Sequence, residues 1–133
     1  MDKINSIMKK LLILLFSIMI SFNSYGEWTY IDKNTNGSTF YIELVTIQKH
    51  EDHVYYWVMN NYLKPDRWGD MSNKMYMQGD CGVNRVKILS YNFYQQPMGK
   101  GKVEVDNTSS EWKYPTPESI NRGLLDSACD YIN

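Results

Sequence analysis

Two cysteines are the residues of this chain with the most distinctive chemistry. Cys81 lies in the stretch Met-Gln-Gly-Asp-Cys-Gly-Val-Asn-Arg, and Cys129 lies close to the last residue of the chain. The sequence contains no C-x-x-C motif, so thiol–disulfide exchange at vicinal cysteines is not indicated. The paired ligand spacings of a structural zinc site are also missing. These residues favour a structural disulfide between Cys81 and Cys129.

The two histidines, His50 and His53, lie in the short segment Lys-His-Glu-Asp-His. Together with Glu51 and Asp52 they form a weak candidate metal site, because imidazole and carboxylate groups both bind divalent metals. Haem iron held by these histidines and neighbouring tyrosines is a further alternative. A solvated polar turn between two strands is the favoured interpretation, because such residues are typical of tight turns.

Other residue types that could support catalysis lack the context that catalysis needs. Met71, Met75 and Met77 are compatible with Cu(I), but Met75 and Met77 share a predicted strand face with Cys81, which favours core packing. No G-x-S-x-G nucleophile elbow and no C-x-x-C-H haem attachment motif occur in the sequence. We therefore expect a protein that is not an enzyme and has no cofactor.

The first 26 residues have the pattern of an export signal. Lys9 and Lys10 precede an apolar run over residues 11–22, and a small residue, Gly26, precedes the expected cleavage site before Glu27. A bilayer span requires about 20 apolar residues, so this run of twelve is too short for a retained anchor. Since the residue after cleavage is glutamate rather than cysteine, a lipid anchor is not expected there.

Cleavage would leave one domain of 107 residues, 27–133, which is large enough to bury a core. Met8, directly before the two lysines, is an alternative start of translation to Met1. Eleven basic and fourteen acidic residues remain in the exported part, so no basic excess favours nucleic acid. The periplasm, the cell surface or the medium is the expected location. Such compartments are oxidising, which supports the Cys81–Cys129 disulfide.

Alternating apolar residues predict a domain rich in β-strands. Asn36-Gly37 is a hairpin signal between the first two strands, and Val103 and Val105 alternate with charged residues in the last one. The expected strands cover about residues 27–33, 38–48, 54–59, 74–81, 84–95 and the segment around Val103–Val105.

Only the C-terminal segment predicts a helix. Thr116 is a candidate N-cap and Pro117 suits the first helical position. Ile120, Leu124 and Ala128 then repeat every four residues along one apolar stripe, which has to pack against the sheet. The sequence therefore predicts an α+β fold with an antiparallel sheet and one C-terminal helix.

The segment from Lys64 to Asn73 is the least regular part of the domain and predicts an exposed loop. Trp68 lies within it, and exposed tryptophans are common anchors of protein–protein contacts. We expect Trp68, Arg67 and Lys64 to contact a partner. The alternative is that Trp68 folds back over the edge of the sheet.

An ordered set of residues resembles a known family. The set is Trp28, Asp80-Cys81, Arg85, Trp112, Pro117-Glu118-Ser119 and Cys129. In this order it resembles the surface-adhesin E family of small exported Gram-negative proteins, over Trp28 to Cys129.

The resemblance implies a six-stranded antiparallel sheet with the C-terminal helix docked on it by the Cys81–Cys129 bond. It also implies a cell-surface protein that binds host extracellular-matrix or serum proteins, with dimers among the family members. We expect an exported, non-enzymatic binding protein that recognises a protein partner. The alternative is a periplasmic structural protein, or one that holds a metal or haem with His50 and His53.

Overall fold

The computed structural model of the chain describes residues 5–10 and 27–133. The apolar run expected to form the core of an export signal, 11–22, therefore lies outside the described residues. No helix within the described residues is long and apolar enough to cross a membrane.

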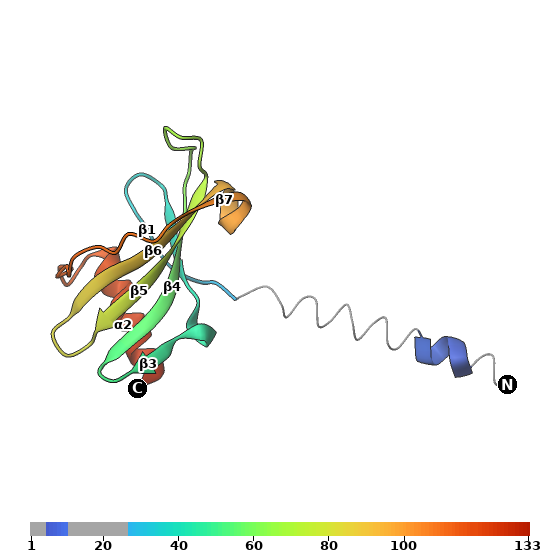
Figure 1. Cartoon of the computed structure of the whole chain (residues 1–133), viewed down its shortest axis with the longest axis horizontal. Helices are drawn as coiled ribbons and strands as arrows, with labels where there is room; N and C mark the ends of the chain where they lie inside the picture. The colour runs from blue at the N-terminus through green and yellow to red at the C-terminus, as the bar shows by residue number, and fades with distance from the viewer. Residues whose placement is uncertain (1–4, 11–26) are drawn as a thin grey trace.

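One antiparallel sheet forms the body of the domain (Figure 1). Its strands lie in the order β1-β2-β4-β5-β6-β7, and β3 also pairs with β4. All neighbouring strands are antiparallel, as predicted, and the sheet has seven strands. The strands are β1 (Thr29–Lys33), β2 (Thr39–Ile42), β3 (Gln48–His50), β4 (His53–Asn61), β5 (Ser72–Asp80), β6 (Arg85–Gln96) and β7 (Lys100–Asp106).

The seventh strand arises because the segment expected as one strand over 38–48 is interrupted. A 3₁₀ turn, η1 (Leu44–Thr46), separates β2 from β3, and the N–H of Ile47 donates to the carbonyl of Leu44. Ile42 and Ile47 are both buried. They are five residues apart, so an unbroken strand would place them on opposite faces of the sheet. The 3₁₀ turn brings both into one core.

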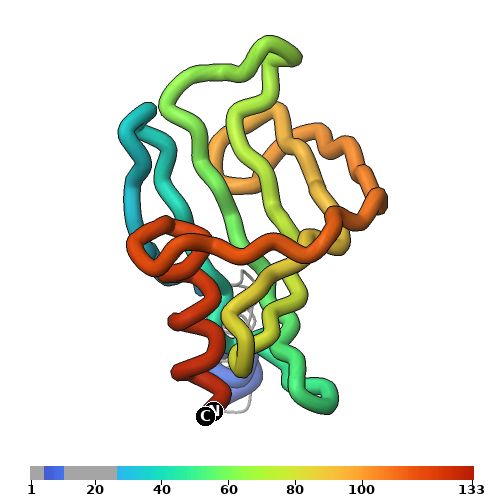
Figure 2. Tube along the Cα trace, turned by 90° about the vertical axis from the view of Figure 1, so that its left-hand side faces the viewer, coloured from blue at the N-terminus to red at the C-terminus, as the bar shows by residue number. Residues whose placement is uncertain are grey.

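The helix α2 (Ile120–Ile132) packs on one face of the sheet and forms the core with it. Figure 2 shows the helix at the side of the sheet and the long connection from β7 that crosses to reach it. Leu124, Leu125 and Ala128 of the helix are fully or almost fully buried. They pack in one cluster with the buried strand residues Val54, Tyr56, Val58, Met77 and Val86.

The helix begins three residues later than the sequence predicts. Ser119, rather than Thr116, is the N-cap, and its Oγ accepts a hydrogen bond from the N–H of Arg122 at 3.2 Å. The carbonyl of Thr116 instead accepts from the N–H of Ser119, so Thr116 belongs to a turn before the helix. Ser119 is the N-cap because its hydroxyl lies within hydrogen-bond distance of a free N–H group of the first helical turn.

The disulfide predicted from the two cysteines is present. Cys81, directly after β5, is bonded to Cys129 in α2, with a Cα–Cα distance of 6.0 Å. The turn beyond Cys81 is held by Asp80, whose Oδ1 accepts hydrogen bonds from the N–H of Gly82 at 3.0 Å and that of Val83 at 3.4 Å. The bond thus fastens the C-terminal half of the helix to the end of the central strands.

Candidate functional site

The loop between β4 and β5 is compact and ordered by its own hydrogen bonds. The N–H of Tyr62 donates to the carbonyl of Met71, which closes the loop at its base. Near the tip, Oδ1 of Asp66 accepts from the N–H groups of Trp68 and Asp70, both at 2.9 Å. We call this segment the 62–71 loop. These internal hydrogen bonds define the conformation of the tip.

Trp68 projects from the tip of this loop. Its side chain is 70% exposed, and the guanidinium carbon of Arg67 lies 4.1 Å from the centre of its ring. The tryptophan therefore lies outside the core, and it carries a stacked cation. Indole and guanidinium groups are the side chains most enriched at binding hot spots. A role of Trp68, Arg67 and Lys64 in binding stays a prediction.

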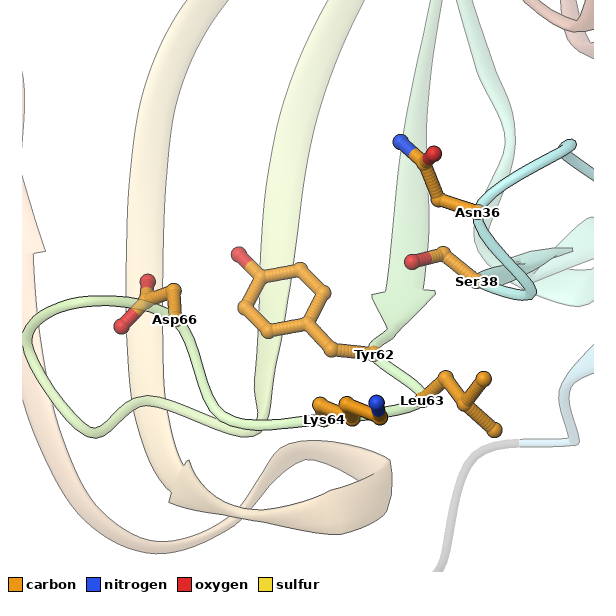
Figure 3. A pocket seen from close by; sticks show the side chains of 6 residues that line it. All are labelled: Asn36, Ser38, Tyr62, Leu63, Lys64 and Asp66. Atoms are coloured by element: carbon orange, nitrogen blue, oxygen red, sulfur yellow. The ribbon is translucent and has the colours of Figure 1, made fainter.

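A hollow lies on one side of the loop, where the loop faces the β1–β2 turn (Figure 3). The hollow has a volume of about 380 Å³. Gly37 in the β1–β2 turn has a φ of 84°, and a Cβ atom there would lie 2.8 Å from Cδ2 of Leu63. Glycine is thus favoured here by the positive φ, and a larger residue would also require Leu63 to shift. The hollow is lined by Asn36, Ser38, Tyr62, Leu63, Lys64 and Asp66.

A second, smaller hollow of about 190 Å³ lies beside Trp68. Residues of β6 and of the edge strand β7 line it together with Trp68, so Trp68 lies near this edge of the sheet, as the alternative stated from the sequence expects. Lys102 and Glu104 bring one charge of each sign to it. The lining residues are Trp68, Asp70, Phe93, Gln95, Lys102 and Glu104. The three residues predicted from the sequence therefore share one loop, with Lys64 at the first hollow and Trp68 at the second.

The base of the loop corrects the sequence prediction, which extended the exposed loop to Asn73. Ser72 and Asn73 belong to β5 and are buried. The Ser72 hydroxyl donates to the carbonyl of Gln96 at 2.6 Å and accepts from the N–H of Gly99 at 2.9 Å. These bonds tie the end of β5 to the β6–β7 turn, which gives the loop a rigid base.

Tyr62 joins the loop to this base. Its hydroxyl accepts a hydrogen bond from Nδ2 of Asn73 at 2.6 Å. Burial raises the pKa of Tyr62 above its usual value, although the hydrogen bond from Asn73 opposes the shift. The phenol is therefore neutral at physiological pH and acts as a fixed anchor for the loop.

The two histidines lie at the end of β4 that is far from the 62–71 loop. They pair with one another across the β3–β4 hairpin. His50 is exposed, whereas His53 contacts β5 through both ring nitrogens. Its Nδ1 is 2.7 Å from Nε2 of Gln78, and its Nε2 is 3.5 Å from a carboxylate oxygen of Asp80. Within the described residues, no group of three histidine, cysteine, aspartate or glutamate side chains is placed to hold a metal ion.

Asp80 is also part of a cluster that sequence reasoning did not assemble. Nε of Arg85 lies 3.1 Å from Oδ2 of Asp80, and the Arg85 guanidinium carbon lies 4.1 Å from the centre of the Trp112 ring. The ring of His53 packs edge-on against Trp112 at 5.4 Å. The sequence feature that could have indicated this cluster is the ordered set of residues that carries the family resemblance. Three residues of that set, Asp80, Arg85 and Trp112, meet here beside Cys81.

The fold resembles solved structures. Over 82% of this chain and 92% of the other, it matches crystal form II of Haemophilus influenzae protein E with a TM-score of 0.63 at 18% identity. A second structure of Haemophilus influenzae protein E matches over 80% of this chain and 86% of its own, with a TM-score of 0.61 at 17% identity. At these identities the structures establish a shared fold.

The family is established by the sequence itself. The family model described as surface-adhesin protein E matches residues 28–130, which is most of the described domain. The chain belongs to the surface-adhesin protein E family. The comparison with curated protein sequences gives no match.

Proposed function

We propose that the chain is an exported, non-enzymatic adhesin that binds a host extracellular-matrix or serum protein through the 62–71 loop. The observation that carries this proposal is Trp68, a 70% exposed indole stacked by Arg67 at the tip of an ordered loop. Interface cores are enriched in tryptophan and arginine, and a fixed loop loses little conformational entropy on binding.

The surroundings of Trp68 support a protein as the partner. Leu63, on the same loop, is 65% exposed and adds apolar area on the side of the larger hollow. Lys64, Asp66, Lys102 and Glu104 surround these apolar groups with charges of both signs. An apolar centre with a polar rim of mixed charge is the usual anatomy of a protein–protein interface.

The test measures binding of the purified protein to immobilised extracellular-matrix and serum proteins by biolayer interferometry. We expect Trp68→Ala to weaken binding to its partner at least tenfold, which corresponds to about 1.4 kcal/mol. The melting temperature should not change, because an exposed side chain contributes little to stability. Tyr114→Ala is the matched control, since Tyr114 is an aromatic residue that is 66% exposed outside the loop. Equal binding by Trp68→Ala and the parent would refute the assignment of the loop.

Location is tested separately on whole cells. Protease added outside intact cells should remove the protein, because an adhesin has to reach its partner. Complete protection until the outer membrane is opened would place the protein in the periplasm and exclude adhesion, whatever the loop binds in vitro.

A further inference from the structure

The sheet face turned away from α2 carries a second concentration of aromatic residues. Successive side chains of a strand point to opposite faces, and Val54, Tyr56 and Val58 of β4 point into the helix-side core. The alternate residues Tyr55 and Trp57 therefore point to the other face, which we call the outer face. The register of β4, β5 and β6 adds further members to it. The outer-face residues that matter below are Tyr55, Trp57, Lys74, Tyr76, Asn92 and Tyr94.

Three of these aromatic rings lie side by side. The ring of Tyr76 is 4.8 Å from that of Trp57 and 6.2 Å from that of Tyr55, measured between centroids. The plane of the Tyr76 ring is tilted by 39° from that of Trp57 and by 30° from that of Tyr55. All three are half-buried. They form a shallow aromatic platform across β4 and β5, distinct from the 62–71 loop.

Next to this platform the outer face contains a cup of about 190 Å³. This is smaller than the roughly 300–1,000 Å³ of a site for a drug-sized ligand, so the cup suits a single ring. The indoles of Trp28 and Trp57 and the phenol of Tyr94 provide its aromatic walls. The lining residues are Trp28, Glu43, Trp57, Lys74, Asn92 and Tyr94.

Lys74 places a cation between these aromatic walls. Its Nζ lies 5.4 Å from the ring centre of Trp28 and 5.1 Å from that of Tyr94, within the range of cation–π attraction. The ion pairs among the described residues involve the carboxylates of Asp80 and Asp126 and do not include Lys74. Lys74 is thus half-buried beside aromatic rings, and Glu43, the acidic residue in the lining of the cup, is not within ion-pair distance of its ammonium.

Polar groups at the edge of the cup are held in place. The N–H of Glu43 donates to the carbonyl of Trp57 at 3.1 Å, and the Glu43 carboxylate accepts from the Thr46 hydroxyl at 2.6 Å. Asn92 lies opposite Lys74 in the β5–β6 register. The cup therefore offers aromatic walls together with a cation, an amide and a carboxylate.

We propose that the outer face binds a glycan and that the cup receives a sugar unit carrying a carboxylate. A pyranose has an apolar C–H face that stacks on indole and phenol rings, and hydroxyl groups at its edge that pair with Asn92 and Glu43. The sugar carboxylate forms the ion pair that Lys74 lacks, in a partly desolvated position where a charged hydrogen bond is strong. The platform of Tyr55, Tyr76 and Trp57 supports the neighbouring sugar units.

The same features disfavour other ligands of aromatic surfaces. Single-stranded nucleic acid also stacks on aromatic rings, but it carries a charge on every nucleotide and requires a positively charged groove, whereas among the described residues Lys74 is the one cation in the lining of the cup. A proline-rich segment also docks on aromatic residues, but its imide rings supply no anion for Lys74. An acidic glycan uses both the rings and the cation.

The experiment titrates the purified protein with a hyaluronan hexasaccharide, which contains glucuronic acid. The four tryptophans give four indole N–H signals in a ¹H–¹⁵N NMR spectrum. We expect the signals of Trp28 and Trp57 to shift and that of Trp68 to stay unchanged. Chitohexaose, a neutral glycan of the same length, should bind at least tenfold more weakly, and decaproline should not bind. Equal binding of chitohexaose, preferential binding of decaproline, or no shift with any glycan would overturn the proposal.

Two matched lysine variants separate the cup from general charge. Lys74→Met keeps the aliphatic stem, removes the cation, and should weaken hyaluronan binding about tenfold, the usual cost of losing a charged hydrogen bond. Lys49→Met is the control, since Lys49 lies opposite Val54 in the β3–β4 register and therefore on the other face of the sheet, away from the cup. Equal loss in both variants would show attraction by charge alone. Trp68→Ala should leave glycan binding unchanged, so failure of this proposal and failure of the protein-binding loop are distinguishable.

Discussion

Gly79 of β5 lies directly against Leu125 of α2, and its substitution gives a sharp test of the packing. An ideal Cβ at this position would lie 2.5 Å from Cδ1 of Leu125, 3.1 Å from Cγ2 of Val54 and 3.2 Å from Cε1 of Tyr56. All three neighbours are buried to 1% exposure or less, so none of them can move into solvent. Gly79→Ala must therefore push α2 away from β5 or distort the strand.

Overpacking of this kind costs about 1–3 kcal/mol, and the contact with Leu125 places Gly79→Ala toward the upper end of that range. Urea denaturation followed by circular dichroism measures the change. In a domain of this size, each 1 kcal/mol corresponds to about 4–8 °C in melting temperature. The glycine of the helix is the matched control, because a Cβ at Gly123 would meet only Cγ2 of Ile31, at 3.9 Å.

Gly123→Ala should therefore have the opposite effect on stability to Gly79→Ala. It removes the cost of glycine in a helix interior and should stabilise the protein by up to about 1 kcal/mol. Combining Gly79→Ala with Leu125→Ala removes the closest clash, so the double variant should be more stable than the sum of the single changes implies. A neutral or stabilising Gly79→Ala would refute the close approach of α2 to β5.

Two further predictions concern buried and paired side chains. The Tyr56 hydroxyl is buried without a hydrogen-bond partner among the described residues, and burial raises its pKa. Tyr56→Phe should therefore leave the free energy of unfolding unchanged or raise it by about 1 kcal/mol in urea denaturation. A clear loss of stability would reveal a partner for the hydroxyl. Burial alone would raise the pKa of Asp80, but hydrogen bonds from Arg85, Gly82 and Val83 outweigh it and lower the pKa below its usual value. The stability from this lowered pKa is present above the unfolded-state pKa of about 3.9 and is lost as the pH falls through the folded-state value. Arg85→Gln should raise the Asp80 pKa in a ¹³C NMR titration, and an unchanged pKa would exclude Arg85 as a cause.

Local patterns were sufficient to predict most of the fold. The clean alternation around Val103 and the four-residue repeat of Leu124 and Ala128 each describe a single element, and both elements are present. The disulfide followed from the compartment and from two apolar faces that had to meet. Each of these inferences needed only neighbouring residues or one pairing.

The misses arose where tertiary contacts decided the local structure. Leu44 continues the alternation of Phe40 and Ile42, so nothing local indicates the 3₁₀ turn that brings Ile47 into the same core as Ile42. Ser72 is a typical loop residue, yet a carbonyl and an N–H of the β6–β7 turn satisfy its hydroxyl and allow it to be buried. The cup on the outer face draws its residues from five separate segments of the chain, so no sequence spacing marks it.

Three of the residues that carry the family resemblance lie at the opposite end of the sheet from the 62–71 loop. Asp80, Arg85 and Trp112 meet beside the Cys81–Cys129 bond, next to the β5–β6 turn. The 62–71 loop lies at the other end of β4 and β5. Each of these strands has nine residues, so the loop and the Asp80 cluster are about 30 Å apart. This part of the resemblance therefore concerns the region where the helix is fastened to the sheet. Specificity for a partner has to be read from the loop and from the outer face, where Trp28 is the member of the set that lines the cup.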